Sequence, residues 1–248
     1  MTNLIEIEGL TRRFGATVAV DGVSFSVAKG EVLGFLGPNG AGKSTTMRLI
    51  AGYLSPSSGR VSVCGHDMAT DPLEAKRLLG YMPEGAPAYP DMTPLGFLKF
   101  IASARGIKEP EKTQRIERAI ELVHLQPVLE QPIETLSKGF QRRLGLAQAI
   151  LHGPWALILD EPTDGLDPNQ KHEVRNLIRA MAPETAIVVS THILEEVEAI
   201  CTRAIIINEG RIVAHGRPEG DSWQLGEVFA PPGCLDGAFR QITQGIPQ

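Results

Sequence analysis

The segment with the clearest chemical potential is GPNGAGKST, which runs from Gly37 to Thr45. It matches G-x-x-x-x-G-K-[ST], the pattern of a phosphate-binding P-loop. An apolar run at 31–36 precedes it and a helix is expected to follow, which is the strand–loop–helix context that such a loop requires. A chance glycine-rich turn is the alternative, but the filled positions and the correct flanks disfavour it.

A P-loop holds phosphate because its glycines let successive backbone N–H groups turn inward, while the following helix adds the positive end of its dipole. Lys43 would supply a full charge at the β- and γ-phosphates, and the Ser44 hydroxyl would bind Mg²⁺. The residues expected to contact the nucleotide in this loop are Gly37, Pro38, Asn39, Gly40, Ala41, Gly42, Lys43, Ser44 and Thr45.

Two acidic residues, Asp160 and Glu161, follow an apolar run that is expected to form a buried strand from Trp155. At the carboxyl end of such a strand, Asp160 could reach the Mg²⁺ held by Ser44, and Glu161 could take a proton from an attacking water. Adjacent acids after a strand are usually a helix N-cap. The pair is therefore informative only because a P-loop lies upstream.

Further polar residues stand in a fixed order around these acids. In LSKGF, residues 136–140, Ser137 and Gly139 would open a helix and offer a second anion site at its N-terminus. An ordinary serine N-cap is the alternative. The segment Asp164-Gly-Leu-Asp167 follows the two acids, and His192 follows an apolar strand, where a lone histidine is usually a structural group.

The alternation of strands and helices predicts an α/β fold with a doubly wound sheet. Residues from about 85 to 152 read as a helical subdomain inserted into this core, with Thr93 as an N-cap and a helix expected at 114–125. We also expect Asp167 to cap a helix and Glu209-Gly210 to close a hairpin. The chain is thus expected to hold one nucleotide-binding domain at 1–220 and a weakly patterned tail at 221–248.

Composition limits the class of protein. The chain has 248 residues and a formal net charge of −5, which argues against a dedicated nucleic-acid binder, so no nucleic-acid partner is expected. Cys64, Cys201 and Cys234 lack metal-site spacing and are interpreted as small buried apolar residues. No apolar run approaches the roughly 20 residues of a membrane span. If the protein works at a membrane, another chain is expected to supply the membrane part.

The order of these motifs, from about Ile5 to Gly216, resembles the ATP-binding subunits of ABC transporters. The resemblance implies a P-loop NTPase core with a mixed sheet, an N-terminal antiparallel β part and a helical signature subdomain. It also implies roles for single residues. These are adenine stacking for Phe14, nucleotide contact from a second subunit for Ser137 and Gly139, the Walker B aspartate for Asp160, the catalytic base for Glu161, the D-loop for 164–167, and the γ-phosphate contact for His192.

In this family two such domains pair head to tail, and each ATP lies between the P-loop of one and the signature helix of the other. The resemblance therefore implies ATP and Mg²⁺ as cofactors, a second nucleotide-binding subunit in what we expect to be a homodimer, and an integral membrane permease driven by ATP hydrolysis at the cytoplasmic face of the cell membrane. The residues point the same way. The P-loop and the anion site at Ser137 can meet on one ATP only if they come from different surfaces.

Two motifs depart from the family pattern. Glu84 stands where the family has a glutamine near Mg²⁺, and a carboxylate is a harder metal ligand than an amide. We expect a position near the metal for Glu84, the alternative being a loop residue that faces solvent. Lys138 and Phe140 replace the usual glycine and glutamine of the signature. Both departures resemble the exporter branch for drug resistance, polysaccharides and gliding motility. From that resemblance we expect the C-terminal region typical of the branch to be shortened in this sequence.

Several readings stay open at this stage. The loop from Tyr81 to Leu95 either forms a dock for a cytoplasmic helix of the permease or packs the core of the helical subdomain. A soluble ATPase of the same class acting on DNA or ribosomes is disfavoured by the single motif set and the acidic balance. A module that binds ATP without hydrolysis is disfavoured by the presence of Lys43, Asp160, Glu161 and His192. The transported substrate is not encoded in these motifs.

Overall fold

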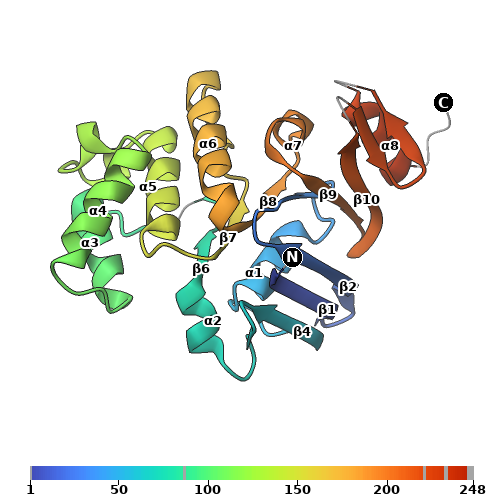
Figure 1. Cartoon of the computed structure of the whole chain (residues 1–248), viewed down its shortest axis with the longest axis horizontal. Coiled ribbons are helices and arrows are strands. Elements are labelled where there is room, and N and C mark those ends of the chain that lie inside the picture. Colours follow the sequence, from blue (N-terminus) through green and yellow to red (C-terminus); the bar gives the residue numbers. More distant parts are fainter. Residues whose placement is uncertain (1, 86–87, 220–221, 232–233, 245–248) are drawn as a thin grey trace.

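Two sheets organise the computed structural model, which describes all residues except 1, 86–87, 220–221, 232–233 and 245–248 (Figure 1). The smaller sheet, in the order β2-β1-β4-β5, is antiparallel. Its strands are β1 (Asn3–Phe14), β2 (Thr17–Ala28), β4 (Ser58–Val63) and β5 (His66–Asp67). The strands expected near the N-terminus are therefore present and form the predicted antiparallel β part.

The larger sheet has the order β12-β11-β10-β9-β3-β8-β7-β6 among the described residues. Its parallel part contains β3 (Val32–Leu36), β6 (Leu79–Met82), β7 (Ala156–Asp160), β8 (Ala186–Thr191) and β9 (Arg203–Asn208). The antiparallel extension contains β10 (Arg211–Glu219), β11 (Ser222–Leu225) and β12 (Val228–Ala230). Parallel and antiparallel pairs in one sheet confirm the predicted mixed sheet and the hairpin at Glu209-Gly210.

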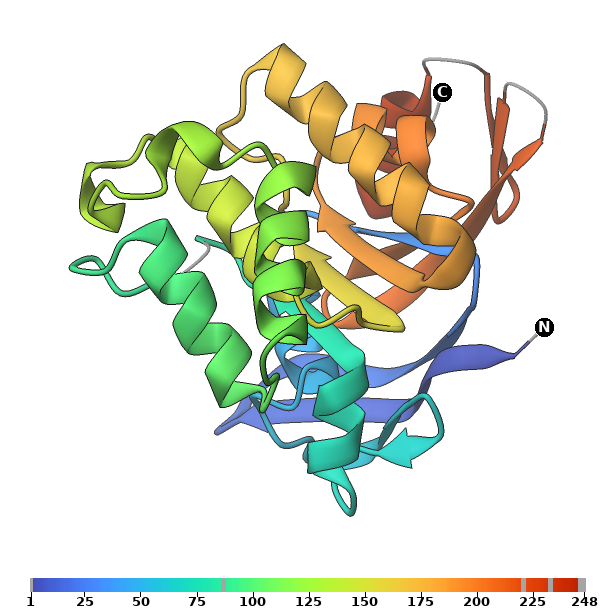
Figure 2. The same cartoon turned by 60° about the vertical axis from the view of Figure 1, so that its left-hand side comes forward.

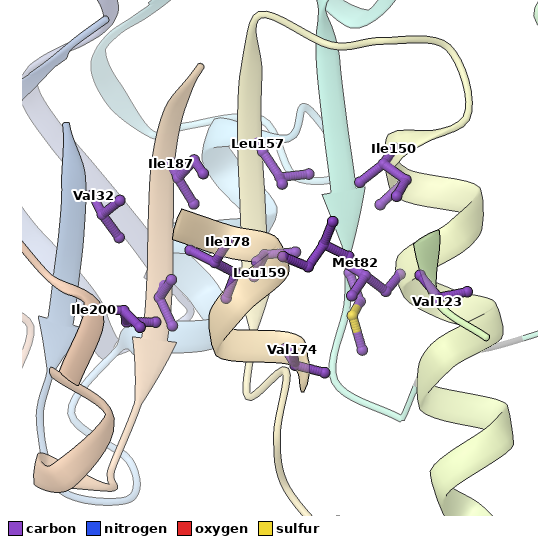
Figure 3. Packing of buried hydrophobic residues seen from close by; sticks show 14 of the residues in the cluster. Val32, Met82, Val123, Ile150, Leu157, Leu159, Val174, Ile178, Ile187 and Ile200 are labelled. Atoms are coloured by element: carbon purple, nitrogen blue, oxygen red, sulfur yellow. The ribbon is translucent and has the colours of Figure 1, made fainter. Parts of the chain in front are cut away.

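The parallel strands are apolar at nearly every position because both faces of the sheet are covered. In β3, Val32 and Leu36 face the helices of one side, while Leu33 and Phe35 face the antiparallel sheet on the other. The first of these clusters continues from the sheet into the helices that cover it (Figure 3). The sheet is thus held from both sides, which fixes the positions of the strand ends.

The described helices are α1 (Lys43–Ile50), α2 (Pro72–Leu78), α3 (Pro94–Ala104), α4 (Glu111–Leu122), α5 (Lys138–Ile150), α6 (Pro168–Met181), α7 (Leu194–Ile200) and α8 (Leu235–Gln244), with short 3₁₀ turns at Gln126–Val128, Ile133–Thr135 and Ala182–Glu184. Helices α3, α4 and α5 gather on one side of the molecule, coloured green to yellow-green in Figure 2. Their apolar residues join the same cluster as the sheet.

Local signals in the sequence set several of the helix starts. The Thr93 hydroxyl accepts from the Gly96 N–H at 3.1 Å, and Asp167 forms a capping box with Gln170, as the sequence predicts. The helix expected at 114–125 runs instead from Glu111 to Leu122. It starts directly after Pro110, and His124 adopts a left-handed φ of 53°, which ends the helix.

The tail is more regular than its composition indicates. Strands β11 and β12 extend the large sheet beyond β10, and α8 packs against β12 and β10. Trp223, Leu225 and Leu235 are buried in the apolar cluster that lies between the large sheet and its covering helices. The Asn208 side chain donates to the backbone carbonyl of Thr243 at 3.3 Å, which ties α8 to β9. The tail is therefore part of the folded core.

The three cysteines do not share one environment. Cys201 is buried and Cys64 is half-buried, but Cys234 is exposed, so the expectation of a buried residue is wrong for Cys234. Cys234 directly precedes α8 and lies at the surface of the protein, whereas the next residue, Leu235, is buried. No helix among the described residues combines the length and the apolar character needed to cross a membrane.

Candidate functional site

Four neighbouring parallel strands, in the order β3-β8-β7-β6, end at the same edge of the sheet. The P-loop follows β3, His192 follows β8, Asp160 closes β7 and Glu84 follows β6 by one residue. Ligands of open α/β sheets bind outside the carboxyl ends of the strands. The strand order thus brings together chemical groups that lie up to 155 positions apart in the chain.

The P-loop takes its shape from close backbone contacts that only glycine allows. Gly42 has a φ of 104°, and a Cβ there would lie 2.4 Å from the Ala19 carbonyl oxygen. A Cβ on Gly37 would lie 2.5 Å from the carbonyl oxygen of Ile207. The loop is further fixed by the Gly210 N–H, which donates to the Ala41 carbonyl at 3.0 Å. The loop therefore rests on β2 and on the hairpin between β9 and β10.

The Lys43 side chain is buried and lies along its own loop. Its Nζ donates to the carbonyl oxygens of Gly37 at 2.7 Å and Pro38 at 3.2 Å. Burial lowers the pKa of Lys43 below its ordinary value, and nearby carboxylates, Glu161 foremost, oppose the shift. A phosphate would give this ammonium a stronger partner than the two carbonyls.

Ser44 and Asp160 meet across the strand ends, with the Ser44 hydroxyl 3.4 Å from Oδ1 of Asp160. The Asp160 side chain is buried, and its Oδ2 has no hydrogen-bond partner among the described residues. Burial raises the pKa of Asp160, and the charge of Glu84 adds to that shift. A buried carboxylate oxygen without a donor beside a hydroxyl fits a Mg²⁺ site, because Mg²⁺ prefers oxygen ligands.

Glu161 occupies a tight turn directly after β7. Its φ is 52°, a left-handed value that is uncommon for a side chain other than glycine, and its N–H donates to the Ser190 carbonyl at 2.8 Å. The Glu161 carboxylate oxygens lie 3.0 Å from Nδ1 of His192. The His192 side chain is 52% exposed while that of Glu161 is 12% exposed. Residues held in such conformations often belong to functional sites.

Lys43, Ser44 and Glu161 line one pocket of about 360 Å³, while Asp160 and His192 lie beside it and are not among its lining residues. Glu84 is one of the residues that line the pocket, and it is also exposed to solvent. Its position is therefore compatible both with a role near the metal and with a loop residue that faces solvent. The residues that line the pocket are Ala19, Asn39, Gly40, Gly42, Lys43, Ser44, Thr45, Glu84 and Glu161. Ala19 is the residue that sequence reasoning missed, because a small residue in a strand carries no chemical signal.

The signature residues lie outside this pocket. Ser137 is the N-cap of α5, and its hydroxyl accepts from the Phe140 N–H at 3.4 Å. Neither Ser137 nor Gly139 is among the residues that line the pocket. Phe14, at the end of β1, is also outside the lining and is 46% exposed, with the Arg12 guanidinium 4.6 Å from its ring centre. One chain therefore places the P-loop residues around this pocket, but it does not place its own Ser137 and Gly139 there.

The proposed docking loop divides into two parts. Tyr81 and Met82 are buried, so they pack the core of the protein. Tyr89 is 55% exposed and contacts the rings of Phe97 and Phe100 edge-on, at 6.3 and 5.6 Å between ring centres. Pro87 lies outside the described residues. The exposed aromatic surface is therefore at the start of the helical subdomain and not along the whole loop.

Several known proteins are similar to this chain. A family model described as ABC transporter matches residues 20–164. The chain is 35% identical over 218 residues to the Nod factor export ATP-binding protein I of Ralstonia nicotianae, which covers 88% of this chain and 68% of that protein.

Two solved structures superpose closely. The ATP-binding subunit of an ABC transporter matches with a TM-score of 0.80 and 32% identity, over 86% of this chain and 90% of that one. A bacterial ABC transporter cassette, solved as a dimer, matches with a TM-score of 0.79 over 87% of this chain and 99% of that one; at 21% identity it supports the fold alone. With the family match, these findings confirm the predicted fold class. The chain belongs to the ABC transporter family, as one of its ATP-hydrolysing subunits.

Proposed function

We propose that this chain is the motor of an exporter, and that it closes head to tail on ATP against a second copy. The observation that carries this proposal is the separation of the two anion sites. Lys43 and Ser44 line the pocket, whereas Ser137 caps α5 outside it. A second subunit would bring its own Ser137 and helix dipole to the exposed side of the bound triphosphate.

Within each site the chain's residues divide the work. The Lys43 ammonium exchanges its hydrogen bonds to the carbonyl oxygens of Gly37 and Pro38 for bonds to the phosphates, and its positive charge neutralises part of their negative charge. Ser44, Asp160 and Glu84 would hold Mg²⁺, which would offset the negative charge of the phosphates. Glu161 accepts the proton of the attacking water, and His192 holds the Glu161 carboxylate and contacts the γ-phosphate. Phe14 stacks on the adenine.

Similarity supports the direction of transport, since the relative from Ralstonia nicotianae is named for the export of Nod factors. The dimer is supported by the two separate anion sites described above. We therefore propose a homodimer at the cytoplasmic face of the membrane, attached to a permease encoded by another chain. The exposed surface around Tyr89 is the proposed contact with that permease.

The proposal is tested by steady-state ATP turnover of the wild-type chain and of Glu161→Gln. Removing a catalytic base slows the chemical step by about 10²–10⁴-fold, while ATP binding should be retained because Lys43 and the loop are untouched. Wild-type turnover in Glu161→Gln would remove Glu161 as the base. Turnover that needs no Mg²⁺ would contradict the metal assignment.

A further inference from the structure

The first two turns of α5, which begin just after Ser137, lie against the segment that follows Glu161. The Arg142 side chain is only 9% exposed, and its Nη2 lies 3.4 Å from Oδ2 of Asp164. Its Nη1 is buried and has no hydrogen-bond partner among the described residues. A buried guanidinium with one long contact depends strongly on that contact, because an unpaired buried charge is costly.

Neighbouring residues of α5 contact the same segment. The Lys138 side chain lies over Gly165, where an added Cβ would be 3.9 Å from Cδ of Lys138. A Cβ on Gly139 would lie only 2.7 Å from Oε1 of Gln170, so the start of α5 approaches α6 closely. The start of α5 is therefore packed against the segment from Asp164 to Gln170.

Asp164, the acidic partner of Arg142, also forms part of the turn that contains Glu161. The Asp164 N–H donates to the Glu161 carbonyl at 3.3 Å, which closes the turn that holds Glu161 in its left-handed conformation. Asp164 therefore touches both the turn of the base and, through Arg142, the helix that Ser137 caps. The path from Glu161 to the signature end runs over one backbone hydrogen bond and one ion pair.

We propose that Arg142 is a positioning residue that couples the two ATP sites of the dimer through one chain. The inference rests on the proposed head-to-tail dimer, in which Glu161 of a chain serves one ATP and its Ser137 serves the other. When the turn at Glu161 changes on hydrolysis, Asp164 carries Arg142 and the start of α5 with it. The signature surface on the opposite site then shifts, so that the two sites respond together.

The experiment compares Asp164→Asn, Arg142→Met and the double variant in the full chain. The readouts are Mg-ATP turnover, the Hill coefficient of its ATP dependence, and ATP affinity measured in the Glu161→Gln background at a protein concentration where light scattering shows a monomer. Because either substitution removes this charge-assisted contact, each single variant should lower kcat about tenfold. The Hill coefficient should fall towards one, and ATP affinity of the monomer should stay the same.

Coupling is read from the double variant. Because both residues act through one contact, the double variant should be no slower than either single variant. Glu74→Gln is the matched control, since it removes an exposed carboxylate from the Arg77 ion pair on α2 and should leave all three readouts unchanged. Arg142→Lys, which keeps the charge but not the reach of the guanidinium, should lie between wild type and Arg142→Met.

Three results would overturn the inference. These are wild-type turnover and cooperativity in Asp164→Asn, a double variant whose loss is the product of the single losses, or an unchanged Hill coefficient in Arg142→Met. If Arg142→Met does not fold, Asp164→Asn and Arg142→Lys decide the matter, since the Asp164 side chain is 58% exposed. If the Glu161→Gln parent itself does not dimerise with ATP, the proposed function fails, which is a separate outcome.

Discussion

Asp160→Asn should make the ligand-free protein more stable while removing its response to Mg-ATP. The Asp160 carboxylate is 1% exposed, and its Oδ2 has no hydrogen-bond partner among the described residues. Leaving a buried acceptor unsatisfied costs about 1–3 kcal/mol. The amide of the variant can donate to the Ser190 hydroxyl, which lies beside the Asp160 side chain on the neighbouring strand and has no hydrogen-bond partner in the described part of the chain.

The expected gain follows from these numbers. For a chain of this size, 1 kcal/mol corresponds to about 2–4 °C in Tm, so Asp160→Asn should unfold at least about 2 °C higher than wild type in EDTA. A ligand at 100 times its Kd adds about 2.7 kcal/mol to the wild type. That second gain should be absent in Asp160→Asn, because the carboxylate that fits Mg²⁺ is gone.

The assay is thermal unfolding in EDTA and again with Mg²⁺ and a non-hydrolysable ATP analogue. Glu196→Gln is the matched control. Glu196 is also buried, with Oε1 unpartnered among the described residues, while its Oε2 accepts from Thr191 at 2.9 Å. It should show the gain in EDTA and keep the response to Mg-ATP. Asp160→Asn that melts below wild type in EDTA, or that keeps the Mg-dependent gain, would refute the reasoning.

The remaining predictions concern the phosphate loop, the unusual acid and the buried histidine. Lys43→Ala should abolish ATP binding, since it removes the one buried ammonium of the pocket described here; unchanged affinity in a titration would contradict the P-loop assignment. Glu84→Gln should require a higher Mg²⁺ concentration for half-maximal turnover, because a charged ligand is lost; an identical Mg²⁺ curve would support a purely solvent-facing Glu84. His152 is buried, with Nε2 3.1 Å from the Leu79 carbonyl oxygen, and burial, aided by the charge of Arg105, lowers its pKa from 6.5 to about 3. The unfolded chain therefore binds a proton that the folded chain does not, and stability should fall by up to about 1.4 kcal/mol per pH unit as pH drops from 6.5 towards 3. His152→Gln should flatten that part of the pH profile measured by urea unfolding, and an unchanged profile would show that another group is responsible.

Local patterns were sufficient for the motifs themselves. The P-loop was predictable because its glycines, lysine and serine must stand at fixed offsets, and the apolar run before Asp160 identified a strand buried on both faces. Asp167 and Thr93 marked helix starts for the same reason, since N-caps act within three residues of the chain. Such signals need no knowledge of distant contacts.

Contacts between distant segments were not predictable from the residues alone. The sequence around Glu84 does not indicate that β6 lies beside β7 in the sheet. The sequence around Gly139 does not indicate that Gln170 packs against it. The strands and the helix of the tail were not predictable for a related reason. Strand β11 spans only Ser222–Leu225, too short for its alternation to be informative, and it gains its structure from pairing with β10. Cys234 shows that residue type alone does not determine burial.

The central claim, that two chains close on ATP, is tested most directly by the mass of Glu161→Gln in light scattering, with and without Mg-ATP. The account predicts a monomer without nucleotide and a dimer with it, because the pocket is completed only when Ser137 of a second chain reaches the triphosphate. A species that binds ATP and stays monomeric at all protein concentrations would contradict an ATP-driven dimer of this chain.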